Sequence, residues 1–167
     1  MYDELTQVDI DKMKEELEHR KTVLRPKLIE DVQIARGFGD LSENFEYKCA
    51  KRDKGRNESR IRYLERMIAT AKIIDTASAD DAIGLFDKVT MFNEKLQKEQ
   101  TIRLVTTLRQ NALQGLISKE SPIGKALLGK KVGDRVEVVV NPDMKYTVEI
   151  RAVEKGEDDD SLEISRY

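Results

Sequence analysis

Three acidic residues gather in a short stretch of the sequence: Asp40, Glu43 and Glu46. One interpretation is structural. Asp40 would cap the start of a helix and Glu43, three residues later, would complete a capping box, in agreement with the preference of acids for helix N-termini. The other interpretation is that the carboxylates form a functional pair. The residue types alone favour capping and leave the functional pair open.

A basic stretch, residues 48–60, follows these acids. It contains six basic side chains and two acidic ones, a local excess of four positive charges. The basic residues are Lys48, Lys51, Arg52, Lys54, Arg56 and Arg60, and the acidic ones are Asp53 and Glu58. Such a row can follow a nucleic-acid backbone, because each cation can neutralise a phosphate. It is also typical of a solvated helix face, so charge alone leaves both interpretations open.

Few other residues offer chemistry. His19 is the only histidine and stands among charged residues, so a catalytic histidine partner for a serine or cysteine is nearly excluded. Cys49 is the only cysteine; it cannot form an internal disulfide, has no companions at metal-ligand spacing and is expected to fill space. The glycines of residues 124–134 do not match the GxxxxGK[ST] phosphate loop.

Composition excludes several classes of protein. Of the 167 residues, 37% are charged and only 5% are aromatic, a balance typical of long solvated helices. Basic and acidic side chains number 30 and 32, so any basic surface must be local. The first ten residues lack the segments of a signal peptide, and no run approaches the roughly 20 apolar residues of a membrane span. We therefore expect a cytoplasmic protein with no membrane partner.

Residues 1–75 are expected to form an antiparallel helical hairpin. Apolar residues at helical spacing define a seam on each arm. The seam residues are Met13, Leu17, Leu24, Leu28 and Ala35 on the first arm, and Tyr47, Ala50, Ile61, Leu64, Ile68 and Ala71 on the second. Lys54 and Asn57 interrupt the second seam. Gly37 and Gly39, between the arms, can adopt positive φ values that reverse the chain. Pro26 predicts a kink or a freed carbonyl in the first arm.

The pattern changes after residue 75, and residues 80–167 are expected to form a second, α+β domain. Alternating apolar residues predict four strands, at Val89 and Met91, at Ile102 and Leu104, at Val136, Val138 and Val140, and at Tyr146, Val148 and Ile150. Ser121-Pro122 predicts a short helix that Gly129 ends. The turn Asn141-Pro142-Asp143 should join the last two strands. The acidic end, from residue 154 onward, is expected to fray.

Two long runs carry a resemblance to a known family. They are ARGFGDLSENFEY, residues 35–47, and SPIGKALLGKKVGD, residues 121–134. The first resembles the tip AR-x-x-GDLSEN-x-EY of the bacterial transcript cleavage factors of the GreA/GreB family, and the second resembles the C-terminal signature of that family. Further matches are Leu5-Thr6, Lys12, Glu16-Leu17 and Arg25-Pro26. The resemblance covers nearly the whole chain and is closer to the GreA type.

This resemblance implies a fold and a partner. The N-terminal part would be a coiled coil, and the C-terminal part would be a small FKBP-like α+β domain that docks on RNA polymerase. The factor would bind through the secondary channel of the polymerase and stimulate cleavage of the nascent RNA 3′ end in backtracked, arrested complexes. It would be an accessory factor rather than an enzyme, and a monomer.

The resemblance also implies roles for five residues. Asp40 and Glu43 match the catalytic acids that help to hold the second Mg²⁺ of the polymerase active site and to orient water. Arg36, Lys51 and Arg52 fall in the basic patch that contacts RNA. The metal would be shared with the polymerase, and the chain is expected to have no cofactor of its own.

Some positions depart from the family pattern. Asp9 replaces a usual glycine, Gly37-Phe38 replaces a commoner polar pair, residues 105–110 lack the usual G-x-x-EAD, and the acidic tail has no counterpart. A non-cleaving regulator that inhibits polymerase from the same channel is the main alternative function, although the intact acid pair argues against it. A pure interaction coiled coil and a free-standing nuclease also remain open.

Overall fold

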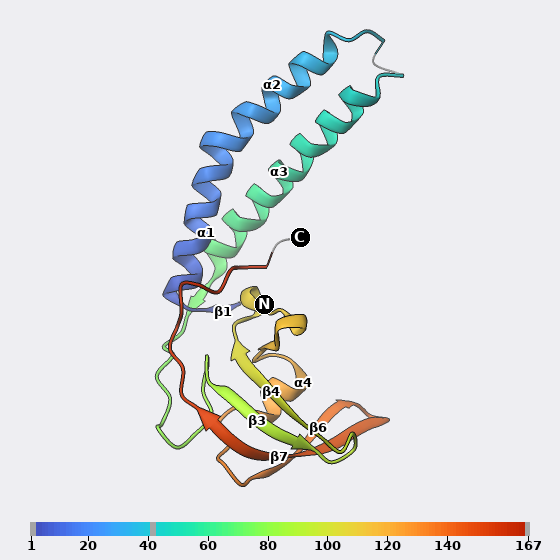
Figure 1. Ribbon diagram of the computed structural model, residues 1–167. Helices are drawn as coiled ribbons and strands as arrows, with labels where there is room; N and C mark the ends of the chain where they lie inside the picture. The colour runs from blue at the N-terminus through green and yellow to red at the C-terminus, as the bar shows by residue number, and fades with distance from the viewer. Residues whose placement is uncertain (1–2, 41–42, 166–167) are drawn as a thin grey trace. The chain divides into compact units, whose positions relative to one another are not determined.

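The computed structural model describes residues 3–40 and 43–165 of the chain. Leu41 and Ser42, which are part of the tip motif, lie outside the described residues. The architecture is α+β, as expected: helices form the first part of the chain and a sheet forms most of the second (Figure 1). Within the described ranges, no helix is both long enough and apolar enough to cross a membrane.

The described residues form two compact units. The first contains Ile10–Ala71, and the second contains Glu4–Asp9 together with the chain from Lys72 onward. The expected division, 1–75 and 80–167, therefore differs from the structure in the placement of Glu4–Asp9. This segment belongs to the second unit because β1 (Glu4–Leu5) pairs in parallel with β2 (Lys72–Ile73).

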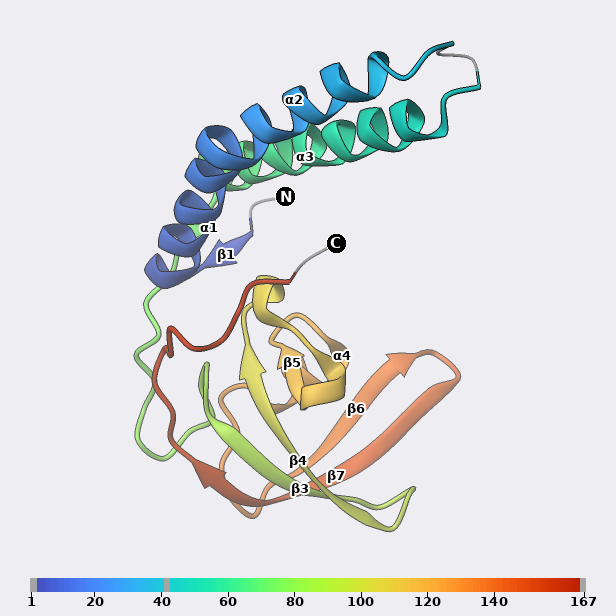
Figure 2. The same cartoon turned by 45° about the horizontal axis from the view of Figure 1, so that its top comes forward.

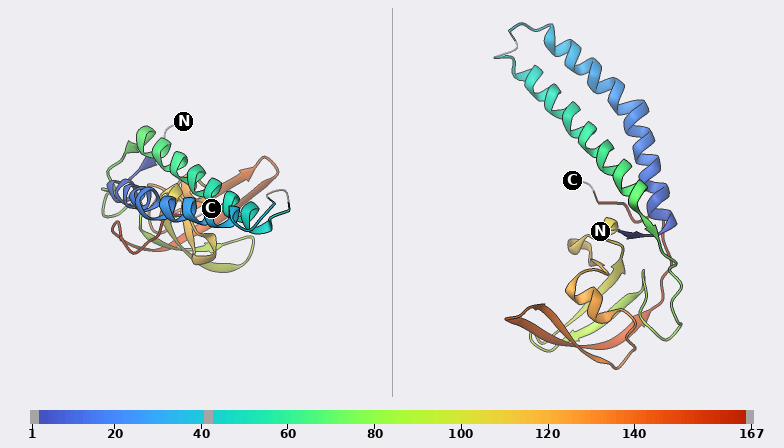
Figure 3. Two further views of the ribbon diagram at one scale, coloured as in Figure 1. Left: turned by 90° about the horizontal axis from the view of Figure 1, so that it is seen from above. Right: turned by 180° about the vertical axis from the view of Figure 1, so that it is seen from behind.

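The first unit is the expected antiparallel helical hairpin. One arm consists of α1 (Gln7–His19), the π-helical segment η1 (Arg20–Leu24) and α2 (Arg25–Arg36), and the other arm is α3 (Phe45–Thr70). α2 and α3 lie side by side and run in opposite directions (Figures 1 and 3). Asp40 and Glu43 therefore lie in the connection between the two arms, and Glu46 lies in the first turn of α3.

The first arm changes its hydrogen bonding directly before Pro26. Proline has no N–H, so Pro26 cannot donate to the carbonyl of Thr22, four residues earlier. The residue before it, Arg25, donates its N–H to the carbonyl of Arg20, five residues earlier and not four, which is the π-helical pattern. The arm bends where α1 passes into α2 (Figure 2). The expected disturbance at Pro26 is confirmed.

The interior of the hairpin is apolar toward both ends and polar in the middle. Its buried apolar residues are Ile10, Met13, Val32 and Ala35 on the first arm and Ile61, Leu64 and Met67 on the second. Between them, Arg60 donates two hydrogen bonds to the carboxylate of Glu16, at 2.9 and 3.0 Å. Asn57 accepts from Arg20 at 3.0 Å. The interruption of the second seam at Asn57 is therefore a polar bridge between the arms.

The second unit is built on a five-stranded sheet with the order β5-β4-β3-β7-β6. Its strands are β3 (Lys88–Asn93), β4 (Lys98–Val105), β5 (Leu116–Ser118), β6 (Arg135–Asn141) and β7 (Met144–Glu154). Neighbours are antiparallel except β4 and β5, which are parallel. Four strands match the expected ones. β5 was not expected, because three residues are too few to display an alternating pattern.

The helix α4 (Pro122–Leu127) packs against this sheet (Figure 2). Ser121 caps it, as expected, and accepts a hydrogen bond from the Gly124 N–H at 3.0 Å. Gly129, at a φ of +77°, follows its end. Leu127 joins the buried strand residues Val89, Met91, Leu104, Val136, Val138, Val148 and Ile150 in one core. The expected turn after Asn141 also forms, since β6 and β7 pair up to Asn141 and Met144.

Candidate functional site

The carboxylates of Asp40 and Glu43 are exposed in the connection between the arms. α2 ends at Arg36 and α3 begins at Phe45, so neither acid belongs to a helix. Gly39 has a φ of +122°, in the region that favours glycine. The expectation of a positive φ at Gly37 is wrong: this residue has a φ of −70°, because its N–H still bonds back to Ile34 as the C-cap of α2.

The N-cap of α3 is Asn44, not Asp40. The Asn44 Oδ1 accepts a hydrogen bond from the Tyr47 N–H at 2.9 Å, and the Asn44 Nδ2 donates to the Ala35 carbonyl at 2.7 Å. The capping interpretation of Asp40 is therefore wrong, because the side chain next to the helix takes the position. Sequence reasoning missed Asn44, although asparagine is among the preferred N-cap residues and stands directly before the helix.

The expected basic patch is exposed at the same end of the hairpin. Arg36 is in the last turn of α2, and its guanidinium lies 5.7 Å from the centre of the Tyr47 ring. Lys51 and Arg52 are exposed on α3, where Arg52 also donates to the sulfur of the half-buried Cys49 at 3.8 Å. Arg60 does not share this surface, because it is buried and paired with Glu16.

The donor chemistry of the acid pair fits Mg²⁺. Carboxylate oxygens are ligands that this ion prefers. Within residues 3–40 and 43–165, no cluster of three or more acidic, histidine or cysteine side chains forms a candidate metal site. Two carboxylates leave most of the near-octahedral shell of Mg²⁺ to other ligands.

A second group of charged residues is buried in the second unit, around Arg109. The Arg109 Nε donates to Asp9 at 2.6 Å, the Nη2 to the Thr6 hydroxyl at 3.1 Å and the Nη1 to Asp158 at 2.5 Å. Burial opposes the charge on this guanidinium, but the bonds to Asp158 and Asp9 outweigh it and raise the pKa of Arg109. Asp9 and Thr6 also bond to each other as a capping box at the start of α1.

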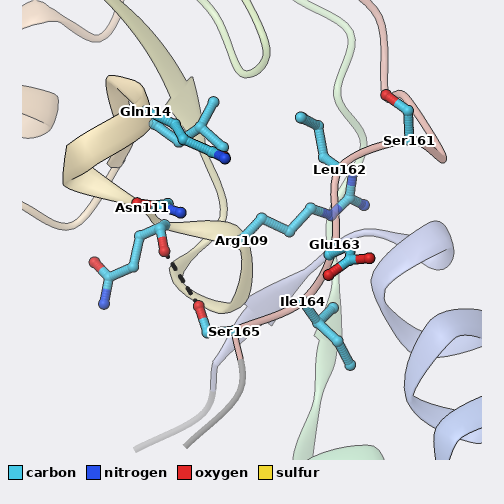
Figure 4. Close-up of a pocket in the computed structure, with 10 residues that line it drawn as sticks. Arg109, Asn111, Gln114, Ser161, Leu162, Glu163, Ile164 and Ser165 are labelled. Carbon is cyan, nitrogen blue, oxygen red and sulfur yellow. Dashed lines mark hydrogen bonds between the residues drawn. The ribbon is translucent and has the colours of Figure 1, made fainter.

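As far as Ser165, the acidic tail lies against this group, contrary to the expectation that it frays; residues 166 and 167 lie outside the described residues. Beyond Asp158, the Ser165 N–H donates to the Leu108 carbonyl at 2.5 Å and the Ser165 hydroxyl to the Gln110 carbonyl at 3.2 Å. A cavity of about 400 Å³ lies between the tail and the segment after Arg109 (Figure 4). It is lined by residues 109–111, 114, 116 and 161–165. The departures from the family pattern at residue 9, at residues 105–110 and in the tail thus meet in one place.

Comparison with protein-family models accounts for almost all of both units. Residues 4–73 match the N-terminal model of the transcription elongation factors, and residues 78–155 match the C-terminal GreA/GreB model. The chain belongs to the GreA/GreB family of transcription elongation factors. The matched ranges include the acid pair and Arg109, whereas Asp158 and the rest of the tail lie beyond them.

Individual GreA relatives match over most of their length. The transcription elongation factor GreA of Mesoplasma florum is 42% identical over 150 residues, which is 89% of this chain and 96% of that protein. GreA of Geobacillus kaustophilus is also 42% identical over 150 residues, 89% and 94% of the two chains. Among solved structures, GreA factor homolog 1 of Thermus thermophilus is 26% identical, covers 93% of this chain and 100% of its own, and superposes with a TM-score of 0.43.

Proposed function

We propose that this GreA/GreB family member is an accessory factor that binds RNA polymerase and stimulates cleavage of the nascent RNA 3′ end in backtracked, arrested complexes. Its relatives are named as transcription elongation factors. The observation that supports a cleavage role is that Asn44 caps α3 while Asp40 and Glu43 remain exposed. The cap of α3 therefore does not require either carboxylate, and both lie at the surface of the connection. The factor would act as a monomer in the cytoplasm.

Asp40 and Glu43 would act as ligands donated to the polymerase active site. Mg²⁺ retains several waters and prefers near-octahedral oxygen ligands, so two exposed carboxylates bind it weakly by themselves. Acids of the polymerase and an RNA phosphate would complete the set, and the hairpin would bring Asp40 and Glu43 within reach. Bound in this way, the ion supplies the positive charge that activates a water molecule and supports the leaving oxygen. The free protein should therefore cleave no RNA.

The basic patch would hold the RNA beside these acids. Lys51 and Arg52 are exposed two turns or less from the start of α3, and each can neutralise one phosphate. Arg36 lies over the Tyr47 ring, which limits the directions its guanidinium can take. These contacts would raise the affinity for a protruding RNA strand without taking part in its hydrolysis.

The test is an RNA cleavage assay on stalled polymerase complexes with Mg²⁺ and a saturating amount of factor. Asp40→Asn and Glu43→Gln keep the shape of each side chain and remove its charge. Each should lower the cleavage rate by roughly 10²-fold, the loss expected when a charge-stabilising group leaves an active site. Glu30→Gln removes an exposed carboxylate from α2 and is the matched control, with a rate like that of the parent protein.

The other functions predict different outcomes in the same assay. A non-cleaving inhibitor would slow RNA synthesis and leave the stalled RNA intact even with the parent protein. A free-standing nuclease would cut RNA when the polymerase is omitted. An interaction coiled coil would tolerate Asp40→Asn and Glu43→Gln without loss. Equal cleavage by the parent and both amide variants at limiting Mg²⁺ would refute the proposed roles of the two acids.

A further inference from the structure

We infer that Asn44 is a positioning residue for the acid pair. Its side chain joins the two ends of the connection between α2 and α3, and this connection carries Asp40 and Glu43. This inference rests on the proposed function. Asn44 is itself 8% exposed, whereas Asp40 and Glu43 are exposed, so it acts through them and does not touch the substrate. Its position directly follows Glu43 in the chain.

The oxygen and the nitrogen of the Asn44 carboxamide each form a hydrogen bond, and the two bonds go to different arms. Its oxygen accepts from the Tyr47 N–H of α3, and its nitrogen donates to the carbonyl of Ala35 in the last turn of α2. The last carbonyls of a helix have no partner within the helix, so the Ala35 carbonyl is available for such a bond. One buried side chain thus caps the start of α3 and also bonds a carbonyl in the last turn of α2.

The bond joins two residues that flank both acids in the chain. Ala35 and Asn44 are nine positions apart, and Asp40 and Glu43 lie between them. The Phe38 N–H also donates to the Ala35 carbonyl, at 3.2 Å, so both ends of the connection meet at this oxygen. A chain segment with tied ends has fewer conformations than an open one. Tying the ends therefore restricts where the two carboxylates can lie.

The requirement for an amide is specific. Serine and aspartate can both accept the Tyr47 N–H bond as N-caps. Neither can replace the donor that bonds the Ala35 carbonyl, because an ionised carboxylate only accepts hydrogen bonds and a serine side chain is shorter than that of asparagine. Asn44→Ser and Asn44→Asp therefore keep the helix cap and remove the bond between the arms. The two variants differ in charge, so an effect common to both comes from the lost bond.

Asn57 provides a matched control within the same hairpin. It is also buried, at 4% exposed, and its carboxamide also bonds the other arm, through the side chain and the carbonyl of Arg20. It lies in the interior of α3, away from the connection. Asn57→Ser removes a bridge of the same kind, so it reports what the loss of such a bridge does to the hairpin alone.

The experiment measures cleavage by stalled polymerase complexes at a series of factor and Mg²⁺ concentrations. Small displacements of reacting groups have large effects on rate. For Asn44→Ser and Asn44→Asp we expect a roughly 10-fold lower rate at saturating factor and a several-fold higher Mg²⁺ concentration at half-maximal rate. The factor concentration needed for half-maximal effect should change less than twofold. Asn57→Ser should lower the thermal unfolding temperature and leave the saturated rate and the Mg²⁺ dependence as in the parent.

Two results would overturn the inference while the proposed function stands. One is a parent-like saturated rate and Mg²⁺ dependence in both Asn44 variants. The other is an equal loss in Asn57→Ser, which would make Asn44 an ordinary stabilising residue of the hairpin. Failure of the proposed function looks different, because then the parent protein itself stimulates no cleavage, and the inference falls with it.

Discussion

The two groups of charged residues in this molecule are built in opposite ways. At the tip of the hairpin, Asp40 and Glu43 are exposed. In the second unit, the Arg109 and Asp9 side chains have 0% exposure and lie 2.6 Å apart. The charges of the first group lie at the surface, and those of the second group are paired with each other inside the protein. Under the proposed function, the same residue types would serve binding in one place and folding in the other.

Desolvation explains why the difference matters. An ion removed from water loses several kcal/mol of hydration, so a buried charge is tolerated only with partners that compensate it. An exposed charge has no such requirement, and most surface substitutions change stability by less than about 0.5 kcal/mol. Loss of a partner in the buried group should damage the fold, whereas loss of an acid at the tip should damage the activity alone.

The largest expected effect comes from Arg109→Met. This change leaves the buried Asp9 carboxylate without its cation, which typically costs about 3–5 kcal/mol. The free energy of unfolding of the second unit can be followed by hydrogen exchange of the β3 and β7 amides. Arg135→Met is the matched control, because the ion pair of Arg135 with Glu94 is largely exposed and such pairs contribute about 0–1 kcal/mol.

A second substitution tests the cause of this loss. Adding Asp9→Asn to Arg109→Met neutralises the stranded carboxylate and keeps an oxygen that can accept the Thr6 N–H bond. The double variant should recover part of the lost stability. If Arg109→Met lowers the free energy of unfolding no more than Arg135→Met, the buried group contributes little to stability. The buried charges would then not differ from exposed ones in their effect on the fold.

A smaller effect is expected at Glu16, which lies between these extremes. Burial acts to raise the pKa of Glu16, but hydrogen bonds from Arg60 and Arg20 outweigh it and hold the pKa below the ordinary value of 4.5. A carboxyl with a lowered pKa in the folded state stabilises the protein fully above about pH 4.5, and this contribution is lost as the pH falls through the folded-state pKa.

Glu16→Gln should therefore remove part of the acid sensitivity of the hairpin. At pH 7 we expect a loss of about 1–2 kcal/mol, because a charged hydrogen-bond partner becomes neutral. Below pH 4.5 the variant and the parent should converge. Chemical unfolding at several pH values, followed by helical circular dichroism, measures both. Glu15→Gln removes an exposed carboxylate from the same helix and should keep the pH profile of the parent. A constant difference at all pH values would contradict the lowered pKa.

Local patterns predicted most of the fold. Helical and alternating periodicities, together with Pro26, Ser121 and Gly129, act over a few residues, and the hairpin, α4 and four strands followed from them. What was missed depends on distant partners. Asp9 and Arg109 are 100 positions apart, so no local sequence pattern predicts their bond. The position of the tail depends on the same group, and the placement of Glu4–Asp9 in the second unit depends on the distant pairing of β1 with β2.

The site was predicted from the resemblance more than from the residues. The residue types favoured Asp40 as a helix cap, and that interpretation is wrong, because Asn44 lies closer to the helix and its carboxamide also bonds Ala35. The capping rule itself is sound and would have found Asn44 if it had been applied at the residue next to the first helical turn. The bond to Ala35 could not be predicted, because it joins two arms whose register is set by packing.

The smallest effect is expected from the basic patch, and it should appear in binding rather than in stability. Lys51→Ala with Arg52→Ala removes two exposed cations from α3, so the free energy of unfolding should change by less than about 0.5 kcal/mol. If both residues contact RNA phosphates, the factor concentration at half-maximal cleavage should rise several-fold. The slope of log affinity against log salt should decrease by up to roughly 1.4, since each phosphate contact on a single strand contributes about 0.7.

The matched control for this pair is Lys14→Ala with Lys27→Ala, which removes two exposed lysines from the first arm of the same hairpin. Both double variants change the net charge equally, so a general attraction to the polymerase would affect them alike. An effect confined to Lys51 and Arg52 would place the RNA at their end of the hairpin. The rate at saturating factor should change little in either variant, because the role proposed for Lys51 and Arg52 is to bind the strand and not to hydrolyse it, and Lys14 and Lys27 lie on the other arm. A large fall in that saturated rate would instead mean that the patch acts with the acids, and the separation of binding from chemistry at the tip would be lost.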